Sequence, residues 1–305
     1  MTYPPETAPQ KALHAFAAAP TASIATATQP KQLSVPGRGP SSPTAQQSGS
    51  SHSPARTLRH ALALAKRGLL KTWRTPEALI DVTLQPIIFL LLFVYLFGGA
   101  IAGSTHDYLR FVLPGLLVQS ILFGSVAIGV NLNTDITKGV FDRFRSLPIA
   151  RSAPLVGAVM ADVIRYVILT IVLMITGYVM GFRIGTNPVE AVLACLLAIG
   201  FALCLCWASV YIGMLARTPG AVQGILFLAM FPLTFGSNVF VQTGSMPGWL
   251  QAFVKVNPAT HLTSAVRGLM LGGPTARPIT YTLCWMVGML VVFFPLALRS
   301  YRRRT

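Results

Sequence analysis

The sequence predicts an all-α membrane protein with six transmembrane helices, an N-terminal amphipathic helix at the membrane surface and a re-entrant helix pair before the last span. The composition, the spacing of the charged residues and the one-sided distribution of the basic residues predict this class. Only 10% of the 305 residues are charged and 53% are hydrophobic. Because a soluble domain carries about 25% charged residues, this chain has too few of them to cover a surface in water.

The first 56 residues differ in texture from the rest. Residues 1–56 consist largely of Ala, Pro, Ser, Thr and Gln, without an apolar run or an amphipathic period. Such a segment buries too little apolar surface to offset its chain entropy. We expect a disordered cytoplasmic tail over 1–56 and a membrane domain over 57–305.

An amphipathic basic helix is expected over 57–75. Apolar residues recur at steps of three and four and basic residues occupy the other side. Its characteristic residues are Leu58, Leu62, Arg67, Leu69, Lys71 and Trp73. The pattern also fits an ordinary half-buried helix. Because a span follows directly, it favours a helix lying in the anionic headgroup layer and contacting membrane lipids.

The charge-free intervals give the positions of the spans. A helix needs about 17–25 apolar residues to cross the ~30 Å hydrocarbon layer, and all but one of the intervals fit a single crossing. We expect spans at about 80–102, 111–132, 160–182, 191–215, 220–241 and 278–298.

The interval 218–254 is longer than one span. After the fifth span, Gly and Pro residues punctuate the chain, and two short apolar helices are expected before and after Asn257 and Pro258. Both are too short to cross a membrane. They form the re-entrant pair at about 248–272, which contains Asn257, Pro258, His261 and Arg267.

The basic residues set the orientation. The chain has 24 Lys and Arg against 8 Asp and Glu, a net charge of +16. Most of the Lys and Arg lie before the first span, between the second and third spans, and after the last span. Since such residues favour the cytoplasmic side, both termini are expected there, in a multi-pass protein of the plasma or inner membrane. The excess of Lys and Arg is then explained by the orientation of the protein in the membrane, and nucleic-acid binding is not expected.

The motifs of several catalytic classes are missing from the sequence. No HExxH or GxSxG motif occurs, the four Cys form no CxxC pair, and no Gly-Lys dipeptide is present to form a nucleotide-binding loop. We expect no catalytic residue, metal or bound cofactor in this chain. ATP and magnesium, if they drive the protein, belong to a partner subunit.

Asp162 and Arg165 lie within or near the third span. A charge at the centre of a membrane helix costs about 2.5–3.5 kcal/mol, so each residue needs a partner or a position near an end. At a separation of three they share one helical face. The pair is read as a structural ion pair, with a proton relay or a substrate contact as the alternative.

The loop after the second span contains a short helix with one apolar face. Phe141, Phe144 and Leu147 recur every three residues, Asp142, Arg143 and Arg145 are polar, and Pro148 ends the helix. This face suits either a protein partner or the underside of the protein's own helix bundle, and periodicity alone leaves both open.

These segments resemble the permeases of ABC-2 type transporters. The residues that carry the likeness are FDRFRSLPIAR at 141–151, LPGLLVQ at 113–119 and NPATHLTSAVRG at 257–268, in collinear order over about 57–304. The sequence is most similar to the daunorubicin-resistance group of drug and lipid exporters.

The resemblance implies a type V exporter-like fold that works with partners. It implies a half-transporter that pairs with a second copy or a sister permease on two copies of an ABC ATP-binding subunit. It also implies that 57–75 is the connecting helix, that about 137–148 is the coupling helix that contacts the ATPase, and that the re-entrant pair is extracellular. Export of a polysaccharide or glycolipid, and a non-transport membrane anchor or intramembrane enzyme, stay as alternatives.

Overall fold

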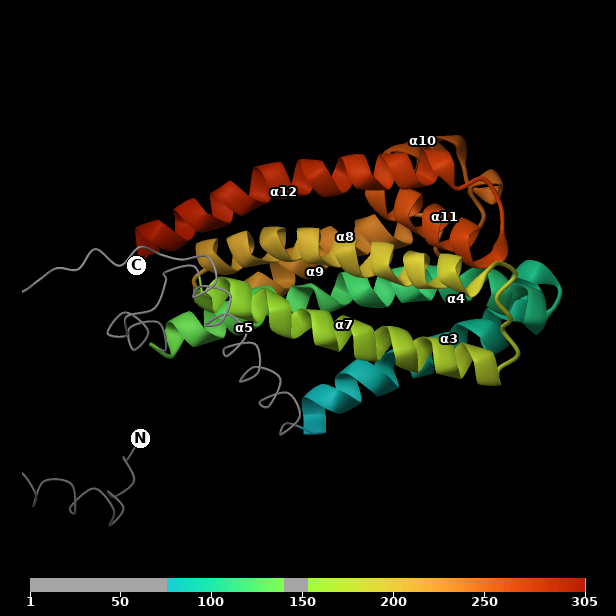
Figure 1. Cartoon of the computed structure of the whole chain (residues 1–305), viewed down its shortest axis with the longest axis horizontal. Coiled ribbons are helices and arrows are strands. Elements are labelled where there is room, and N and C mark those ends of the chain that lie inside the picture. The colour runs from blue at the N-terminus through green and yellow to red at the C-terminus, as the bar shows by residue number, and fades with distance from the viewer. Residues whose placement is uncertain (1–75, 140–152, 305) are drawn as a thin grey trace, which may run out of the picture. The chain divides into compact units, whose positions relative to one another are not determined.

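The computed structural model describes residues 76–139 and 153–304. All of them belong to one unit, 51–305, and are largely helical (Figure 1). The α-helices of this part of the chain are α3 (Pro76–Ala102), α4 (Thr105–Gly124), α5 (Val126–Thr137), α7 (Ala153–Val179), α8 (Pro188–Leu215), α9 (Pro219–Phe235), α10 (Gly248–Val256), α11 (Pro258–Leu271) and α12 (Ala276–Arg304). A single 3-10 turn, η1 (Thr243–Ser245), precedes α10.

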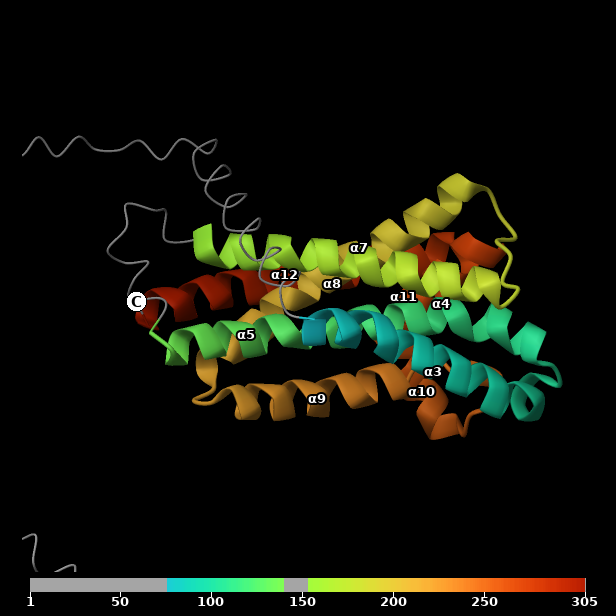
Figure 2. The same ribbon diagram turned by 90° about the horizontal axis from the view of Figure 1, so that it is seen from below.

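The long helices lie side by side and run back and forth along the bundle (Figures 1 and 2). The end of α5, the α8–α9 connection and the C-terminal end of α12 lie at one end of the bundle. The α3–α4 turn, the α7–α8 connection and the α11–α12 connection lie at the other, together with α10. This alternation is the pattern of a multi-pass membrane bundle.

Five stretches of helix in the described chain are long and apolar enough to cross a membrane, and α9 is a shorter apolar helix. The all-helical membrane fold expected from the sequence is thereby confirmed. The count of six spans and the re-entrant character of α10 and α11 stay predictions, because length and composition alone do not place a helix across a bilayer.

The α4–α5 stretch forms the centre of the bundle and α12 lies at its edge. In an 18-residue apolar window within Thr105–Thr137, 72% of the residues are buried, against 11% in the corresponding window within Ala276–Tyr301. Helix α4 packs against α3, α7 and α11, whereas α12 packs against α8 and α11. The outward side chains of α12 are apolar, including Val287 and Val291, as expected of a helix that faces lipid.

The second span, expected as one helix over 111–132, is interrupted. Helix α4 ends at Gly124 and α5 starts at Val126. At the interruption the Ser125 hydroxyl donates to the carbonyl of Leu122 at 2.7 Å, so a side chain competes with the regular helical bonds. Gly-Ser pairs are common sites of helix kinks.

The fifth span, expected over 220–241, is helical only as far as Phe235. Pro232 lies in its last turn, and the amide Nδ2 of Asn257 donates to the carbonyls of Leu233 at 2.8 Å and Gly236 at 2.6 Å. A side chain from outside the helix thus occupies carbonyls that a continued helix would use. Residues 236–242 instead form an irregular segment that leads to η1.

Candidate functional site

Two of the segments singled out by the sequence lie outside the described residues. They are the expected interfacial helix at 57–75 and almost all of the expected coupling helix at 137–148. The residues concerned are Leu58, Leu62, Arg67, Leu69, Lys71, Trp73, Phe141, Asp142, Arg143, Phe144, Arg145, Leu147 and Pro148. Their roles stay predictions.

Asp162 and Arg165 come together on α7. The Arg165 Nη1 and Asp162 Oδ1 atoms are 3.6 Å apart. Asp162 is buried, and its second oxygen, Oδ2, has no hydrogen-bond partner within the described part of the chain. The Arg165 guanidinium also donates through Nη2 to the carbonyl of Gly124 at the end of α4. The pair therefore links α7 to the interruption in the second span.

Asn257 and Pro258 start α11, and the Asn257 side chain also reaches α9. Its Oδ1 accepts from the backbone N–H of Ala259 at 2.9 Å and so caps α11. Its Nδ2 holds the two carbonyls at the end of α9 described above. One side chain thus fixes the start of one helix and the end of another.

Arg267 ties α11 to α4 and to the segment after α9. Its Nε and Nη2 donate to the Phe111 carbonyl at 3.2 and 3.0 Å, and Nη2 donates to the Asn238 carbonyl at 3.1 Å. Burial lowers the pKa of the guanidinium to about 10, so it stays charged at neutral pH. It also lies 3.9 Å from the centroid of the Phe111 ring, a cation–π geometry. Arg267 therefore has a structural role, because it links α11 to α4 and to the segment after α9.

His261 stacks on Tyr281 of α12, with 4.9 Å between the ring centroids. Partial burial lowers the pKa of its imidazole below the usual 6.5. The ring is thus neutral at neutral pH and packs as a flat polar side chain. Within the described ranges, no group of three or more His, Cys, Asp or Glu is placed to hold a metal ion.

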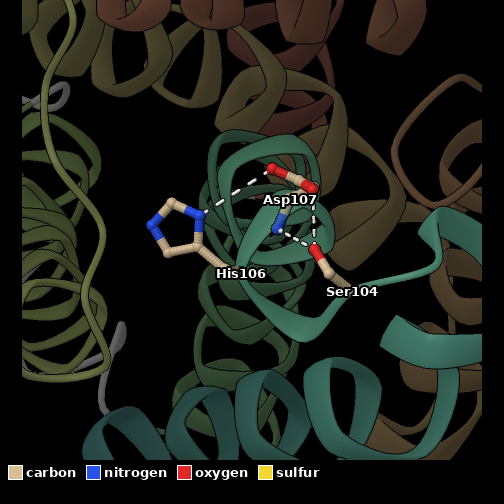
Figure 3. Close-up of polar contacts among 3 residues, drawn as sticks. All are labelled: Ser104, His106 and Asp107. Carbon is tan, nitrogen blue, oxygen red and sulfur yellow. Dashed lines mark hydrogen bonds and ion pairs between the residues drawn. The ribbon is translucent and has the colours of Figure 1, made fainter.

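Figure 3 shows a polar cluster at the start of α4. The backbone N–H of Asp107 donates to the Ser104 hydroxyl at 3.0 Å, that hydroxyl lies 2.7 Å from Asp107 Oδ2, and His106 Nδ1 lies 3.8 Å from Asp107 Oδ1. His106 and Asp107 are exposed. The arrangement is that of a helix N-cap, and it serves the fold rather than a reaction.

A groove of about 490 Å³ lies between α3, α4, α5, α7 and α9. Its apolar lining is dominated by five phenylalanines. Phe89 comes from α3, Phe123 from α4, and Phe227, Phe231 and Phe235 from α9. The Phe123 ring centroid lies 5.5 Å from that of Phe227 and 6.0 Å from that of Phe231. These rings present broad, flat apolar surfaces.

The aromatic wall continues beyond the groove. Phe235 stacks on Phe240 at 5.1 Å, Phe240 stacks on Phe93 at 4.5 Å, and Phe93 stacks on Phe89 at 6.0 Å. Phe240 thus joins the α9 side of the groove to the α3 side. The Tyr108 hydroxyl donates to the Phe240 carbonyl at 3.2 Å and fixes this connection to α4.

Polar groups face the same groove. They are Gln85, Gln119, Ser120, Asn131, Arg165 and Gln223. The Oε1 atom of Gln119 is buried and has no hydrogen-bond partner among the described residues. Flat rings with a few convergent polar groups are typical of sites for small amphipathic molecules.

Sequence reasoning missed the groove, apart from Arg165. A signal was present, because Phe227, Phe231 and Phe235 recur every four residues on one face of α9, and Gln119 and Phe123 do so on α4. What was missing was the knowledge that these two faces meet.

Comparison with known proteins identifies the family. The family model described as ABC-2 type transporter matches residues 59–271. The chain belongs to the ABC-2 type transporter family. Its relatives are permease subunits of ABC transporters, so this chain is a transport subunit. ABC-2 permeases partner with ATP-binding subunits in ABC exporters.

Several curated proteins are similar to this ABC-2 permease along most of their length. The daunorubicin resistance ABC transporter permease protein DrrB1 of Streptomyces coeruleorubidus is 42% identical over 78% of this chain and 84% of its own. A probable doxorubicin resistance ABC transporter permease protein, DrrC of Mycobacterium tuberculosis, is 27% identical over 83% of this chain and 92% of its own. A putative transport permease of Cyanophora paradoxa is 27% identical over 70% of this chain and 74% of its own.

Proposed function

We propose that this permease exports an amphipathic, drug-like or lipid-like aromatic compound from the cytoplasm, driven by ATP that a separate subunit hydrolyses. The groove supports this proposal most directly. Five phenylalanines and six polar side chains line about 490 Å³, a size suited to a drug-sized molecule. Relatives named for daunorubicin and doxorubicin resistance support the same substrate class.

The partner assembly follows from the family and the charge pattern. Two ATP-binding subunits, carrying ATP and magnesium, would join this chain and a second permease copy or sister permease. Lys138, Arg217 and Arg299 lie at the end of the bundle where α5 and α12 finish. By the positive-inside rule this end is cytoplasmic, as are both termini, and the segment 137–148 is available to the ATPase.

The proposal is tested by transport in lipid vesicles. The permease and its ATP-binding subunit are reconstituted together, and ATP-dependent movement of daunorubicin, a labelled phospholipid and a lipid-linked oligosaccharide is measured. We expect movement of daunorubicin or the phospholipid, abolished when the partner cannot hydrolyse ATP. Movement of the oligosaccharide alone would identify a polysaccharide or glycolipid exporter, and no movement of any probe would favour a non-transport role.

The groove makes a separate prediction. Phe231→Ala removes a ring that contacts Phe123 and stacks on Phe235 at 5.1 Å. Because loss of one large apolar contact costs about 1.5 kcal/mol or more, the daunorubicin concentration for half-maximal transport should rise about tenfold. Phe294→Ala is the control, since Phe294 packs on Trp207 and does not line the groove. Equal effects of the two changes would remove the groove from the pathway.

The expected role of the loop between the second and third spans leads to another testable prediction. If Phe141 and Phe144 fill a groove on the ATPase, the double change Phe141→Ala/Phe144→Ala should preserve membrane abundance but abolish stimulation of the partner's ATPase. Burial of each ring contributes roughly 1.5–3 kcal/mol. Arg143→Gln serves as the control, because an ion pair at a protein surface contributes little, so a small effect is expected if this side chain makes only surface contacts. Full transport and full co-purification of the double variant would make the loop a helix packed under its own bundle.

A further inference from the structure

The groove is lined from both sides of the interruption in the second span. Gln119, Ser120 and Phe123 precede Ser125 on α4, and Ala127, Val130 and Asn131 follow it on α5. A molecule that fills the groove therefore touches both helices at once. Any change in the angle between them changes the shape of the groove, and the converse also holds.

The two halves of this span belong to different groups of helices. Helix α4 packs mainly against α3, α7 and α11, and α5 packs mainly against α8 and α9. Asn133 Nδ2 on α5 donates to the carbonyls of Gly213 at 2.8 Å and Ala216 at 2.9 Å, at the end of α8. Backbone contact between Gly129 and Gly213 brings the same two helices together. Helix α5 is thus held to α8 and would move with it.

Arg165 holds the α4 side of this junction from a third helix, α7. Its guanidinium, on α7, donates to the carbonyl of Gly124, the last residue of α4. A cation is favoured at this position by the partial negative charge of a helix C-terminus. Gly124 leaves room for it, because a Cβ there would lie 3.5 Å from Arg165 Nη2 and 3.0 Å from the Tyr166 ring. The same guanidinium lines the groove.

The guanidinium can bind more than one acceptor. It has five N–H donors in a fixed plane, and in this structure it contacts Asp162 and the Gly124 carbonyl. A carbonyl or hydroxyl oxygen of a molecule in the groove competes for these donors. Asp162 does not line the groove, so the ion pair would hold the guanidinium through Nη1 while Nη2 exchanges partners.

We propose that Arg165 is a positioning residue that exchanges the Gly124 carbonyl for an acceptor oxygen of the substrate. This exchange releases the end of α4, where α5 begins, from α7, so that the angle between α4 and α5 can change. The inference rests on the proposed export function and specifies its substrate as an aromatic compound that carries carbonyl or hydroxyl oxygens. Helix α5 leads along the chain into the 137–148 segment, so a change of the α4–α5 angle transmits occupancy of the groove to the ATPase. Arg165 thus couples substrate binding to ATP hydrolysis.

The test separates binding from stimulation. The full permease–ATPase complex in lipid nanodiscs is assayed for daunorubicin binding by equilibrium dialysis and for ATPase activity with and without the drug. Arg165→Gln should bind daunorubicin within about threefold of the unchanged protein but lose most of the drug-stimulated ATPase activity. Arg165→Lys should recover only part of the stimulation, because an ammonium group lacks the planar fork.

Asp162→Asn is the matched control. It removes the charge of the ion pair but keeps the guanidinium and the Gly124 carbonyl, so drug stimulation should persist. A merely structural role for Arg165 predicts instead that Arg165→Gln and Asp162→Asn lower binding, basal activity and stimulation together. That result, or full stimulation in Arg165→Gln, overturns the inference and leaves the export function standing.

A second measurement on the unchanged groove keeps the inference testable if Arg165→Gln fails to assemble. Spin labels at the exposed positions Thr105 and Lys138, near the far ends of α4 and α5, report the angle between the helices. The native cysteines are replaced first, and the labelled permease is diluted with unlabelled permease. Daunorubicin should shift the distance between the labels. An unchanged distance with bound drug overturns the inference, and absence of both binding and transport overturns it together with the export function.

Discussion

Replacing Gly213 by alanine should destabilise the permease strongly. The added Cβ would lie 2.6 Å from the carbonyl oxygen and 3.1 Å from the Cα of Gly129, and neither backbone atom can move without shifting α5. Overpacking of this kind costs about 1–3 kcal/mol. We expect the midpoint temperature of the purified protein to fall by about 5 °C and its membrane abundance to fall with it.

Gly224→Ala is the control for that change. Gly224 also lies inside a helix, but nothing lies within 4 Å of a Cβ built there. Because alanine is about 1 kcal/mol better than glycine in a helix interior, this variant should be as stable as the unchanged protein or more so. Opposite signs for the two alanines, measured as thermal midpoints, would establish the α5–α8 crossing. Similar midpoints would refute it.

Asn257→Ala should be more damaging still. It removes the cap of α11, which contributes about 1 kcal/mol, and it strands the carbonyls of Leu233 and Gly236. Each of these partly buried carbonyls, left without its hydrogen bond, costs roughly a further 1–2 kcal/mol. We therefore expect a loss of stability of about 3–5 kcal/mol, with most of the chain degraded or extracted from the membrane in an unfolded form.

Asn187→Ala isolates the capping contribution. Asn187 also precedes a proline and caps a helix, its Oδ1 accepting from the N–H of Val189 at 3.2 Å. It is exposed, and the only hydrogen bond of its side chain in the described structure is this cap. Loss of the cap alone should cost about 1 kcal/mol. If Asn187→Ala and Asn257→Ala unfold at the same denaturant concentration, the bonds from Asn257 to α9 contribute nothing.

Charge spacing and proline positions were enough to place several helices. Pro76 starts α3, the long charge-free interval before Arg217 contains all but the first turn of α8, and the Gly272-Gly-Pro274 run ends α11. These signals are local, because a charge or a proline acts on its own segment whatever surrounds it. The sequence places the end of the fifth span several residues after Phe235, where α9 ends. The side chain that occupies the last carbonyls of α9 comes from Asn257, more than 20 residues further along the chain, so local sequence does not reveal it.

The spacing of glycines along the sequence does not predict where two helices come into close contact. Gly-xxx-Gly spacing permits close helix contacts. At Gly99, Gly103, Gly220 and Gly224, which have this spacing, an added Cβ would nevertheless meet nothing within 4 Å. The tight crossing lies instead at Gly129 and Gly213, on different helices and more than 80 residues apart. The groove is unpredictable for the same reason, because its lining is assembled from five helices.

The bonds of Asn133 constrain how the permease is made. Its acceptors, Gly213 and Ala216, lie 80 and 83 residues further along the chain, so during synthesis α5 exists well before the end of α8. An unpaired amide in hydrocarbon costs several kcal/mol. We therefore expect the end of α5 that carries Asn133 to stay at an aqueous face of the membrane until α8 has been inserted, whereas the end of α9 is already synthesised when Asn257 appears. Assembly of the bundle is thus ordered by the chain itself, with closure of α5 onto α8 as a late step.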